Sequence, residues 1–426
     1  MKIMPGYNRK GMHQIRMCCL LMIVILLLVK PNLANAQTYD LLIKNAHLID
    51  PKNKLNGIMD LAITNGIITK VGKDIPAADS KKTIDATGLF IVPGMIDIHT
   101  HVFVGPEPDK FANGQNSVSP DDFSFKSGVT TVVDAGTSGW HNFPLFKTQV
   151  IDHMKTRVLA FLNINADGLT GKPTEEDLTK MIVDSAVMVQ QKYPDIIVGI
   201  KIGHFEGADW APFDRALQAA TLTKTPLFVE CHLPKYSLQD QLNKMRAGDI
   251  ITHSYEQITE RMSVVDETGK LRGFVLAAKQ RGVLFDLGHG GAGFWFSQAV
   301  PAYKQGLAPN SFGSDLHRFS MNAGMKSMVN IMSKYMAIGM PLEDAVLRAT
   351  WNPAQSIHRP DLGNLSEGAV ADIALLRLIT GNFGFLDAGG SKLEGKQKLE
   401  AELTLRAGKI VWDLNGMAAQ EIYHEK

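Results

Sequence analysis

Hydrophobic residues follow one pattern at the two ends of this chain and another in its middle. In 39–91, and again in 371–412, short runs alternate apolar and polar residues and are separated by turn residues such as Asn65-Gly66. This alternation predicts antiparallel strands joined by tight turns. We expect both chain ends, 37–92 and 356–426, to pair into one small β-sandwich domain.

The middle of the chain alternates short β-rich runs with longer helical stretches. This order is typical of βα units around a parallel sheet, whose strands are buried on both faces and therefore nearly all apolar. Eight such runs predict an α/β fold, a (β/α)8 TIM barrel that spans 93–355. The predicted strands are Met95–His99, Val129–Ala135, Val158–Ile164, Ile196–Ile202, Leu227–His232, Ile250–His253, Val283–Leu287 and Ser311–Leu316.

Residues 1–36 are predicted to be a secretory signal peptide and not part of the fold. Residues 1–16 contain four basic residues and no acid, 17–29 are almost purely apolar, and 34–36 offer small residues for cleavage. A retained membrane anchor is the alternative, but it needs roughly 20 apolar residues, and this run is shorter. We expect an exported protein, periplasmic or secreted, with no stable membrane anchor after cleavage.

The composition narrows the classes of partner. Cleavage after Ala36 removes five lysines and arginines and no acid, so the net charge changes from +1 to −4. This balance disfavours nucleic acid and anionic membrane surfaces as partners. Of the three cysteines, only Cys231 stays in the mature chain, which excludes a disulfide framework within one chain. The 45% hydrophobic content and the length suit a globular protein with a large core, and a homo-oligomer is compatible with this composition.

Residue types that bind metals stand at the carboxyl ends of several predicted strands, where barrel enzymes build their active sites. An apolar strand that ends in His-x-His carries both imidazoles on one face, and the other candidates each follow a separate apolar run. Imidazole and carboxylate groups are good ligands for zinc-like ions. The candidate set comprises His99, His101, Lys201, His232, His253 and Asp315. Together these residues predict a two-metal hydrolase.

Two of these residues allow a role beyond simple ligation. A desolvated lysine near cations loses its proton more readily, and the neutral amine of Lys201 can capture carbon dioxide as a carbamate that bridges two ions. Asp315 could cap a helix, but at a strand end it fits a metal-bound carboxylate that takes a proton from water. His204, His289 and His317 are candidates for substrate contacts, with ordinary rim positions as the alternative.

The segment 103–126 is rich in Gly, Pro, Asn and Ser. Long loops with this composition are uncommon in compact domains and often serve as active-site lids. We therefore predict a loop over the mouth of the barrel, acting either as a lid or as irregular surface.

The candidate set and its flanking segments resemble the amidohydrolase superfamily, in its binuclear, carboxylated-lysine branch. The flanking segments are 92–97 (VPGMID) and 368–373 (GAVADI). The segments 286–291 (DLGHGG) and 314–317 (SDLH) resemble the dihydroorotase-like amidohydrolase/deacetylase group within it. The resemblance covers nearly the whole mature chain.

The resemblance implies a role for each candidate ligand. His99, His101 and Asp315 would hold the more buried ion, and His232 and His253 the more exposed one. The carbamate of Lys201 would bridge the two. Two divalent ions are implied as cofactors, zinc by default, although manganese or iron suits the same ligands.

The implied reaction is hydrolysis of an amide or ester bond in a small acylated compound. Hydroxide held by the metals attacks, Asp315 acts as general base, and His289 is expected to help stabilise the oxyanion. A further cation near Lys201 would be expected to grip a substrate carboxylate, but Ile202, Gly203 and His204 follow it. His204 or Lys235 would have to substitute for that cation, so an acidic substrate is in doubt.

Three rival functions place different requirements on the same residues. A cyclic amidase, or an enzyme of the lactonase or phosphotriesterase kind, would share all six ligands and stays open. A mononuclear deaminase is disfavoured, because it would carry His-x-x-Glu at the fifth strand, whereas residues 233–235 (LPK) follow His232. A non-enzymatic metal-binding barrel predicts the loss of a ligand or of the proton acceptor, and none is missing.

Overall fold

The structure is a computed structural model that describes Met1 and residues 38–107, 110–230, 235–257 and 262–420. The predicted signal peptide lies outside these residues, apart from Met1. Within the described part of the chain, no helix is long and apolar enough to cross a membrane.

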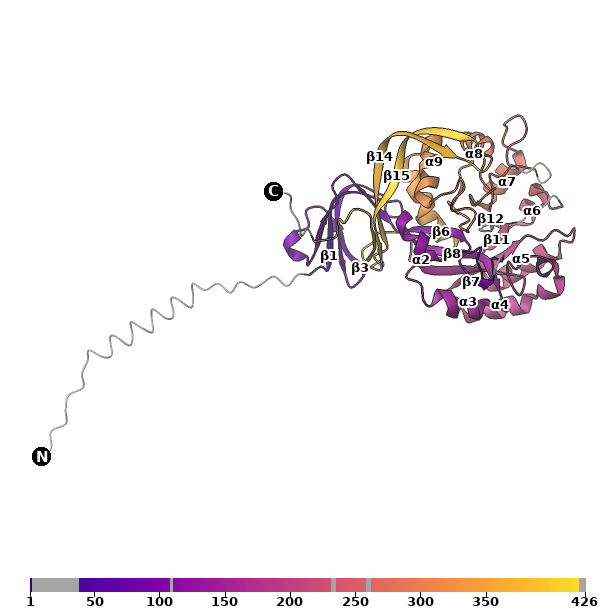
Figure 1. Cartoon of the computed structure of the whole chain (residues 1–426), viewed down its shortest axis with the longest axis horizontal. Helices are drawn as coiled ribbons and strands as arrows, with labels where there is room; N and C mark the ends of the chain where they lie inside the picture. Colours follow the sequence, from indigo (N-terminus) through magenta and orange to yellow (C-terminus); the bar gives the residue numbers. More distant parts are fainter. Residues whose placement is uncertain (2–37, 108–109, 231–234, 258–261, 421–426) are drawn as a thin grey trace.

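Two sheets organise the chain, and the first is a mixed sheet built from both chain ends (Figure 1). Its strand order is β16-β15-β14-β5-β1-β2-β3, and β4 pairs with β1 on the side. The strands are β1 (Leu41–Asp50), β2 (Leu55–Thr64), β3 (Ile67–Gly72), β4 (Thr83–Asp85), β5 (Phe90–Pro93), β14 (Ile373–Leu386), β15 (Lys392–Arg406) and β16 (Lys409–Asp413). The pairing of β5 with β14 joins the two ends, as the alternating patterns predict.

The turn between β2 and β3 shows how local sequence sets this sheet. Asn65 and Gly66 both adopt positive φ, 52° and 77°, the combination that a two-residue hairpin turn requires and that Asn-Gly favours. Beyond this turn, Ile68 N donates to Ala369 O at 2.9 Å, so the edge strand β3 contacts the segment that leads into β14. The strands of both chain ends share one apolar core. They are connected into one mixed sheet, whereas the alternating patterns predict a sandwich.

The second sheet is parallel and has seven strands, in the order β13-β12-β11-β10-β9-β8-β6. The strands are β6 (Met95–Thr100), β8 (Val129–Gly139), β9 (Arg157–Asn163), β10 (Ile197–Gly203), β11 (Leu227–Glu230), β12 (Ile250–Ile251) and β13 (Leu284–Phe285). Each corresponds to a predicted strand, and nearly every residue in them is buried. The parallel order brings their carboxyl ends to one edge of the sheet.

The eighth predicted strand, 311–316, contacts both edges of this parallel sheet. Ser311 forms a parallel bridge to Asp286, the residue after β13, and Leu316 forms one to Thr100 of β6. Leu287 N donates to Ser311 O at 3.0 Å, and His101 N donates to Leu316 O at 2.8 Å. The segment thus joins the two edges through isolated bridges.

Helices follow the parallel strands and pack on the outside of the sheet (Figure 1). They are α2 (Pro120–Phe123), α3 (Phe143–Phe146), α4 (Val183–Lys192), α5 (Ala211–Thr223), α6 (Leu238–Lys244), α7 (Gly273–Gln280), α8 (Phe296–Lys304), α9 (Met328–Ile338), α10 (Leu342–Ala349) and α11 (Trp351–Ser356). Single helical turns are η1 (Ala77–Asp79), η2 (Phe125–Ser127), η3 (Lys147–Ile151), η4 (Thr174–Glu176) and η5 (Leu178–Lys180), and a short strand, β7 (Val104–Glu107), follows β6.

The long hairpin of β14 and β15 leaves the mixed sheet and extends over α9 (Figure 1). Leu399 N of β15 donates to Ser333 Oγ of α9 at 2.9 Å, which anchors the hairpin there. The sequence predicts only the start of β14 and the end of β15, because the middle of the hairpin mixes exposed and part-buried residues and lacks a clear apolar alternation.

Candidate metal and catalytic site

The carboxyl ends of the parallel strands bring potential metal ligands together in two groups. One group contains His99, His101 and Asp315, and the other contains His99, Glu230 and His253. Within each group the donor atoms lie within 4.8 Å of one another, and all of these side chains are buried. His99 belongs to both groups, so the two positions are adjacent.

The first group is centred on the carboxylate of Asp315. Its Oδ1 lies 3.1 Å from His101 Nε2 and 3.4 Å from His99 Nε2. Burial raises the pKa of Asp315, but the nearby His99 and His317 lower it more, so the net pKa is well below its usual range. Burial also lowers the pKa of His101 to about 4. An ionised carboxylate beside a neutral imidazole is a donor set for a divalent ion.

Hydroxyl groups behind both histidines fix how the rings face the site. His99 Nδ1 lies 2.8 Å from Thr252 Oγ1, and this hydroxyl donates to Asp286 Oδ2 at 2.8 Å. Because its one proton is used there, Thr252 accepts from His99 Nδ1, which leaves Nε2 unprotonated when the ring is neutral. His101 Nδ1 is held likewise by Thr137 Oγ1 at 2.8 Å.

The surroundings of His99 Nε2 show whether a metal ion fits the site. Among the described residues, the buried His99 Nε2 makes no hydrogen bond, yet it lies 3.4 Å from Asp315 Oδ1 and 3.5 Å from Glu230 Oε2. Buried polar atoms in proteins almost always have a partner. An imidazole nitrogen that faces two carboxylates is therefore well placed to bind a divalent ion.

The second group contains a carboxylate that the sequence analysis missed, Glu230 at the end of β11. Its Oε2 contacts Lys201 Nζ, and its Oε1 lies 3.0 Å from His253 Nε2 and 3.1 Å from His204 Nε2. Burial raises the pKa of Glu230, but Lys201, His204 and His253 lower this pKa by more. The net pKa is therefore well below its usual range. The signal was available, because Glu230 ends an apolar run as the other candidates do.

The structure thus places five of the six predicted ligands, and Glu230 with them, at one edge of the parallel sheet. The sixth, His232, lies outside the described residues. Three site residues have left-handed backbone: His204, His253 and Asp315, with φ of 63°, 51° and 51°. This conformation costs of order 1–3 kcal/mol for a residue other than glycine and clusters at functional sites.

The three predicted substrate contacts have different surroundings. His204 lies between Glu175 and Glu230, with its nitrogens 3.5 and 3.1 Å from their oxygens. Burial opposes its charge, but the two carboxylates prevail and raise its pKa to about 10. His317 Nε2 lies 3.7 Å from Asp315 Oδ2. His204 and His317 therefore border the metal ligands directly.

His289 is fully buried and uses both ring nitrogens within the protein. Its Nδ1 lies 3.0 Å from Gly290 O, and its Nε2 lies 2.7 Å from Lys334 Nζ on α9. This geometry makes His289 a link between the site and α9. Lys334 was not among the sequence candidates, because it stands on a helix and not at the end of a strand.

The segment after β6, predicted to be a loop over the barrel mouth, lies beside the metal ligands. The ring of Phe111 lies 5.2 Å from the ring of His101 and 5.5 Å from that of His317. Backbone hydrogen bonds join Val118 N to His101 O at 3.0 Å and Arg318 N to Asn116 O at 2.9 Å. The segment therefore lines the site, and its role as a moving lid stays a prediction.

Glycines in 288–291 let the backbone pass close to the metal ligands. Substitution of Gly290 should therefore disturb the site. Gly290 has φ of +45°, and a Cβ there would lie 2.0 Å from Asp315 Oδ2, whereas a Cβ on Gly291 would meet nothing within 4 Å. Gly290→Ala should displace Asp315 and lower kcat/KM by about 100-fold, while Gly291→Ala should retain wild-type activity. Equal activities of the two variants would contradict the close approach.

Lys334 predicts a pH dependence of stability in the metal-free protein. Burial, together with Lys326, lowers its pKa to about 7 from 10.5. Between these values the native state binds fewer protons than the unfolded state, so stability should rise with pH, by at most about 1.4 kcal/mol per pH unit. Lys334→Met should remove this slope. Urea unfolding of both proteins at pH 7.5 and 9.5 measures it, and parallel slopes would mean that Lys334 stays charged when folded.

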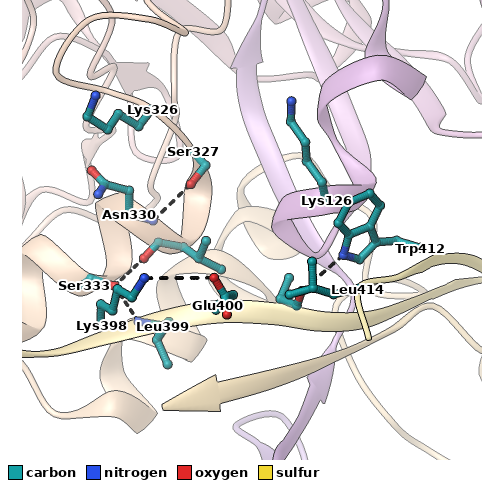
Figure 2. A pocket seen from close by; sticks show the side chains of 12 residues that line it. Lys126, Lys326, Ser327, Asn330, Ser333, Lys398, Leu399, Glu400, Trp412 and Leu414 are labelled. Atoms are coloured by element: carbon teal, nitrogen blue, oxygen red, sulfur yellow. Dashed lines mark hydrogen bonds and ion pairs between the residues drawn. The ribbon is translucent and has the colours of Figure 1, made fainter. Parts of the chain in front are cut away.

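A groove with a volume of about 390 Å³ lies away from this site, between α9, η2 and strands β15 and β16 (Figure 2). Three lysines border it, Lys126, Lys326 and Lys398, and Glu400 and Trp412 line its floor and wall. None of the candidate metal ligands that the structure describes lines it. The groove is therefore separate from the group of candidate metal ligands at the strand ends.

Comparison with known proteins shows which family this chain is similar to. Residues 297–411 match the Amidohydrolase family. A deacetylase of Agrobacterium fabrum is 31% identical over 344 residues, which cover 79% of this chain and 82% of that protein. A deacetylase of Brucella anthropi is 30% identical over 333 residues, which cover 76% and 81%.

Solved structures of related enzymes have a similar fold. A crystal structure of an adenine deaminase superposes with a TM-score of 0.80 at 28% identity, covering 88% of this chain and 100% of that one. A dihydroorotase superposes with a TM-score of 0.78 at 28% identity, covering 88% and 99%. The chain belongs to the amidohydrolase family, as a dihydroorotase-like, metal-dependent hydrolase that acts on non-peptide bonds.

Proposed function

We propose that this protein is a binuclear hydrolase that removes the acyl group from small acylated compounds, by cleaving an amide or ester bond. The observation that carries the proposal is the pair of adjacent donor groups that share His99. Relatives named deacetylases, each covered over more than two thirds of its length, support the acyl group as the part removed.

His99, His101 and Asp315 would hold the first ion, and His253 would contribute to the second. The neutral amine of Lys201 would attack the carbon of carbon dioxide. An N–C bond would form, one C=O π bond would open to give an oxyanion, and the nitrogen would release a proton to solvent. The resulting carbamate would be able to bridge the two positions. When bound, the two divalent ions would lower the pKa of a water between them and polarise the substrate carbonyl. Zinc suits the imidazole-rich first position best.

Asp315 would accept and then donate the proton during hydrolysis. Its carboxylate is ionised and buried, and its Oδ2 faces His317 and His253 at 3.7 and 3.9 Å. It would take the proton from the attacking water and deliver it to the leaving amine or alkoxide. His317 would border the substrate from the solvent side, where its side chain is 12% exposed.

Two further proposals concern the setting of the site. The bridges from 311–316 to both edges of the parallel sheet support a closed (β/α)8 barrel, with strand ends converging on the metals. The basic, apolar and small-residue order of 1–36 supports export and cleavage, so the enzyme would act on small molecules outside the cytoplasm.

The test measures metal content and substrate range on one sample of the mature protein. Elemental analysis should give two ions per chain, and turnover should appear with acetyl esters or N-acyl amino acids. The panel also holds cyclic imides, lactones and adenine, the compounds that a cyclic amidase, a lactonase or a deaminase would turn over. Turnover of one of these alone would replace the deacylase proposal. Two ions per chain with no turnover of any compound would refute it.

A further inference from the structure

We infer that Glu230, and not His232, is the ligand that β11 contributes to the second ion. The inference rests on the proposed function, because it concerns the same two-metal site. It replaces the imidazole expected at this strand end with a carboxylate.

Glu230 lies in the sheet beside the other candidate ligands. β11 pairs in parallel with β10, with Phe228 opposite Lys201 and Glu230 opposite Gly203. Glu230 is the last residue of β11 that the structure describes, and it stands at the edge where the other ligands stand. Its oxygens lie 3.0 Å from His253 Nε2 and 3.5 Å from His99 Nε2. Glu230 therefore supplies a donor from β11 to the group of His99, Glu230 and His253.

The charges around Glu230 also favour a metal ion beside it. Its side chain is 4% exposed, and Lys201, which contacts it, is fully buried. In the metal-free chain the ammonium group of Lys201 neutralises the carboxylate. Formation of the carbamate would change the charge of Lys201 from +1 to −1 and leave two buried anions side by side. Buried charges need compensation. His204, 3.1 Å from Glu230 Oε1, offsets one of the two anions, and the second ion would supply the remaining positive charge.

The donor types predict the metal preference of the second position. With Glu230 and the carbamate as oxygen donors, His253 is the single imidazole assigned to the second ion alone. Oxygen donors suit Mn²⁺ better than imidazoles do. The second position should therefore bind Mn²⁺ more tightly, relative to Zn²⁺, than a position with two imidazoles would. Glu230→His should shift this ratio towards Zn²⁺, and an unchanged ratio would overturn the assignment.

Zinc binding to paired variants tests the inference directly. Glu230→Gln keeps the size of the side chain and removes its charge, and His232→Asn removes the rival ligand. Competition with a chelator in bicarbonate buffer should show the second zinc weakened at least about 100-fold in Glu230→Gln, as ligand loss should exceed the effect of a supporting residue. His232→Asn should stay within about threefold of wild type. The opposite order would overturn the inference.

Diffraction from zinc-loaded wild-type crystals at the zinc absorption edge tests the inference without a variant. A zinc ion about 2.0–2.2 Å from a Glu230 oxygen would support it, and a zinc ion bonded to His232 in its place would overturn it. A wild-type chain that holds one zinc would overturn the two-metal proposal and this ligand together. Two zinc ions held with Glu230 but without hydrolysis would refute the deacylase function alone.

Discussion

Asp315→Asn should lower kcat by about 10²- to 10⁴-fold, the contribution that a general base typically makes. The substitution preserves shape but removes the charge that faces His99 and His101 at 3.4 and 3.1 Å. An amide cannot accept the proton of the attacking water, and it is a weaker ligand than a carboxylate. We therefore expect activity and affinity for the first ion to fall together.

Steady-state kinetics and metal analysis on the same preparation measure this effect. Asp184→Asn is the matched control, because Asp184 is exposed in the first turn of α4 and remote from the ligands. The control should match wild type in kcat and metal content. If Asp315→Asn kept most of its kcat while holding two ions, another residue would have to accept the proton.

The residues that sequence reasoning found share one physical property. His99, Lys201 and His253 each follow a buried, mainly apolar stretch, and Asp315 stands near the end of the predicted strand 311–316. Parallel strands bring such positions to one edge. The spacing along the chain carries no information on distance in space, but the strand-end position does. The same rule would have found Glu230, had acidic residues at strand ends been counted with the histidines.

Other parts of the site leave no local signal in the sequence. Thr252 and Thr137 orient the histidines through hydroxyl groups, and a threonine in a strand is otherwise an ordinary β-former. Lys334 reaches His289 from a helix 45 residues away, a contact that only the tertiary packing creates. The centre of the β14–β15 hairpin likewise depends on α9 beneath it, not on its own alternation.

Lys201→Ala should lose activity and the second ion together. Lys201 is fully buried, its Nζ contacts Glu230, and it lies 4.9 Å from the centre of the Phe228 ring. Truncation removes the amine that would become the bridging carbamate, and it leaves a space where the side chain was. A short carboxylic acid such as acetate or propionate fits that space and supplies the missing bridging oxygens. We therefore expect partial recovery of both activity and metal content when the acid is added.

Lys201→Met separates rescue from a general effect of added acid. Methionine fills most of the space of the lysine and carries no amine, so this variant should be as inactive as Lys201→Ala but insensitive to acetate. Lys304→Ala, at the exposed end of α8, should behave as wild type with and without the acid. Full activity of Lys201→Ala without any acid would remove the carbamate from the mechanism. In that case, the buried carboxylate of Glu230, 3.0 Å from His253 Nε2, would still be available to hold a second ion.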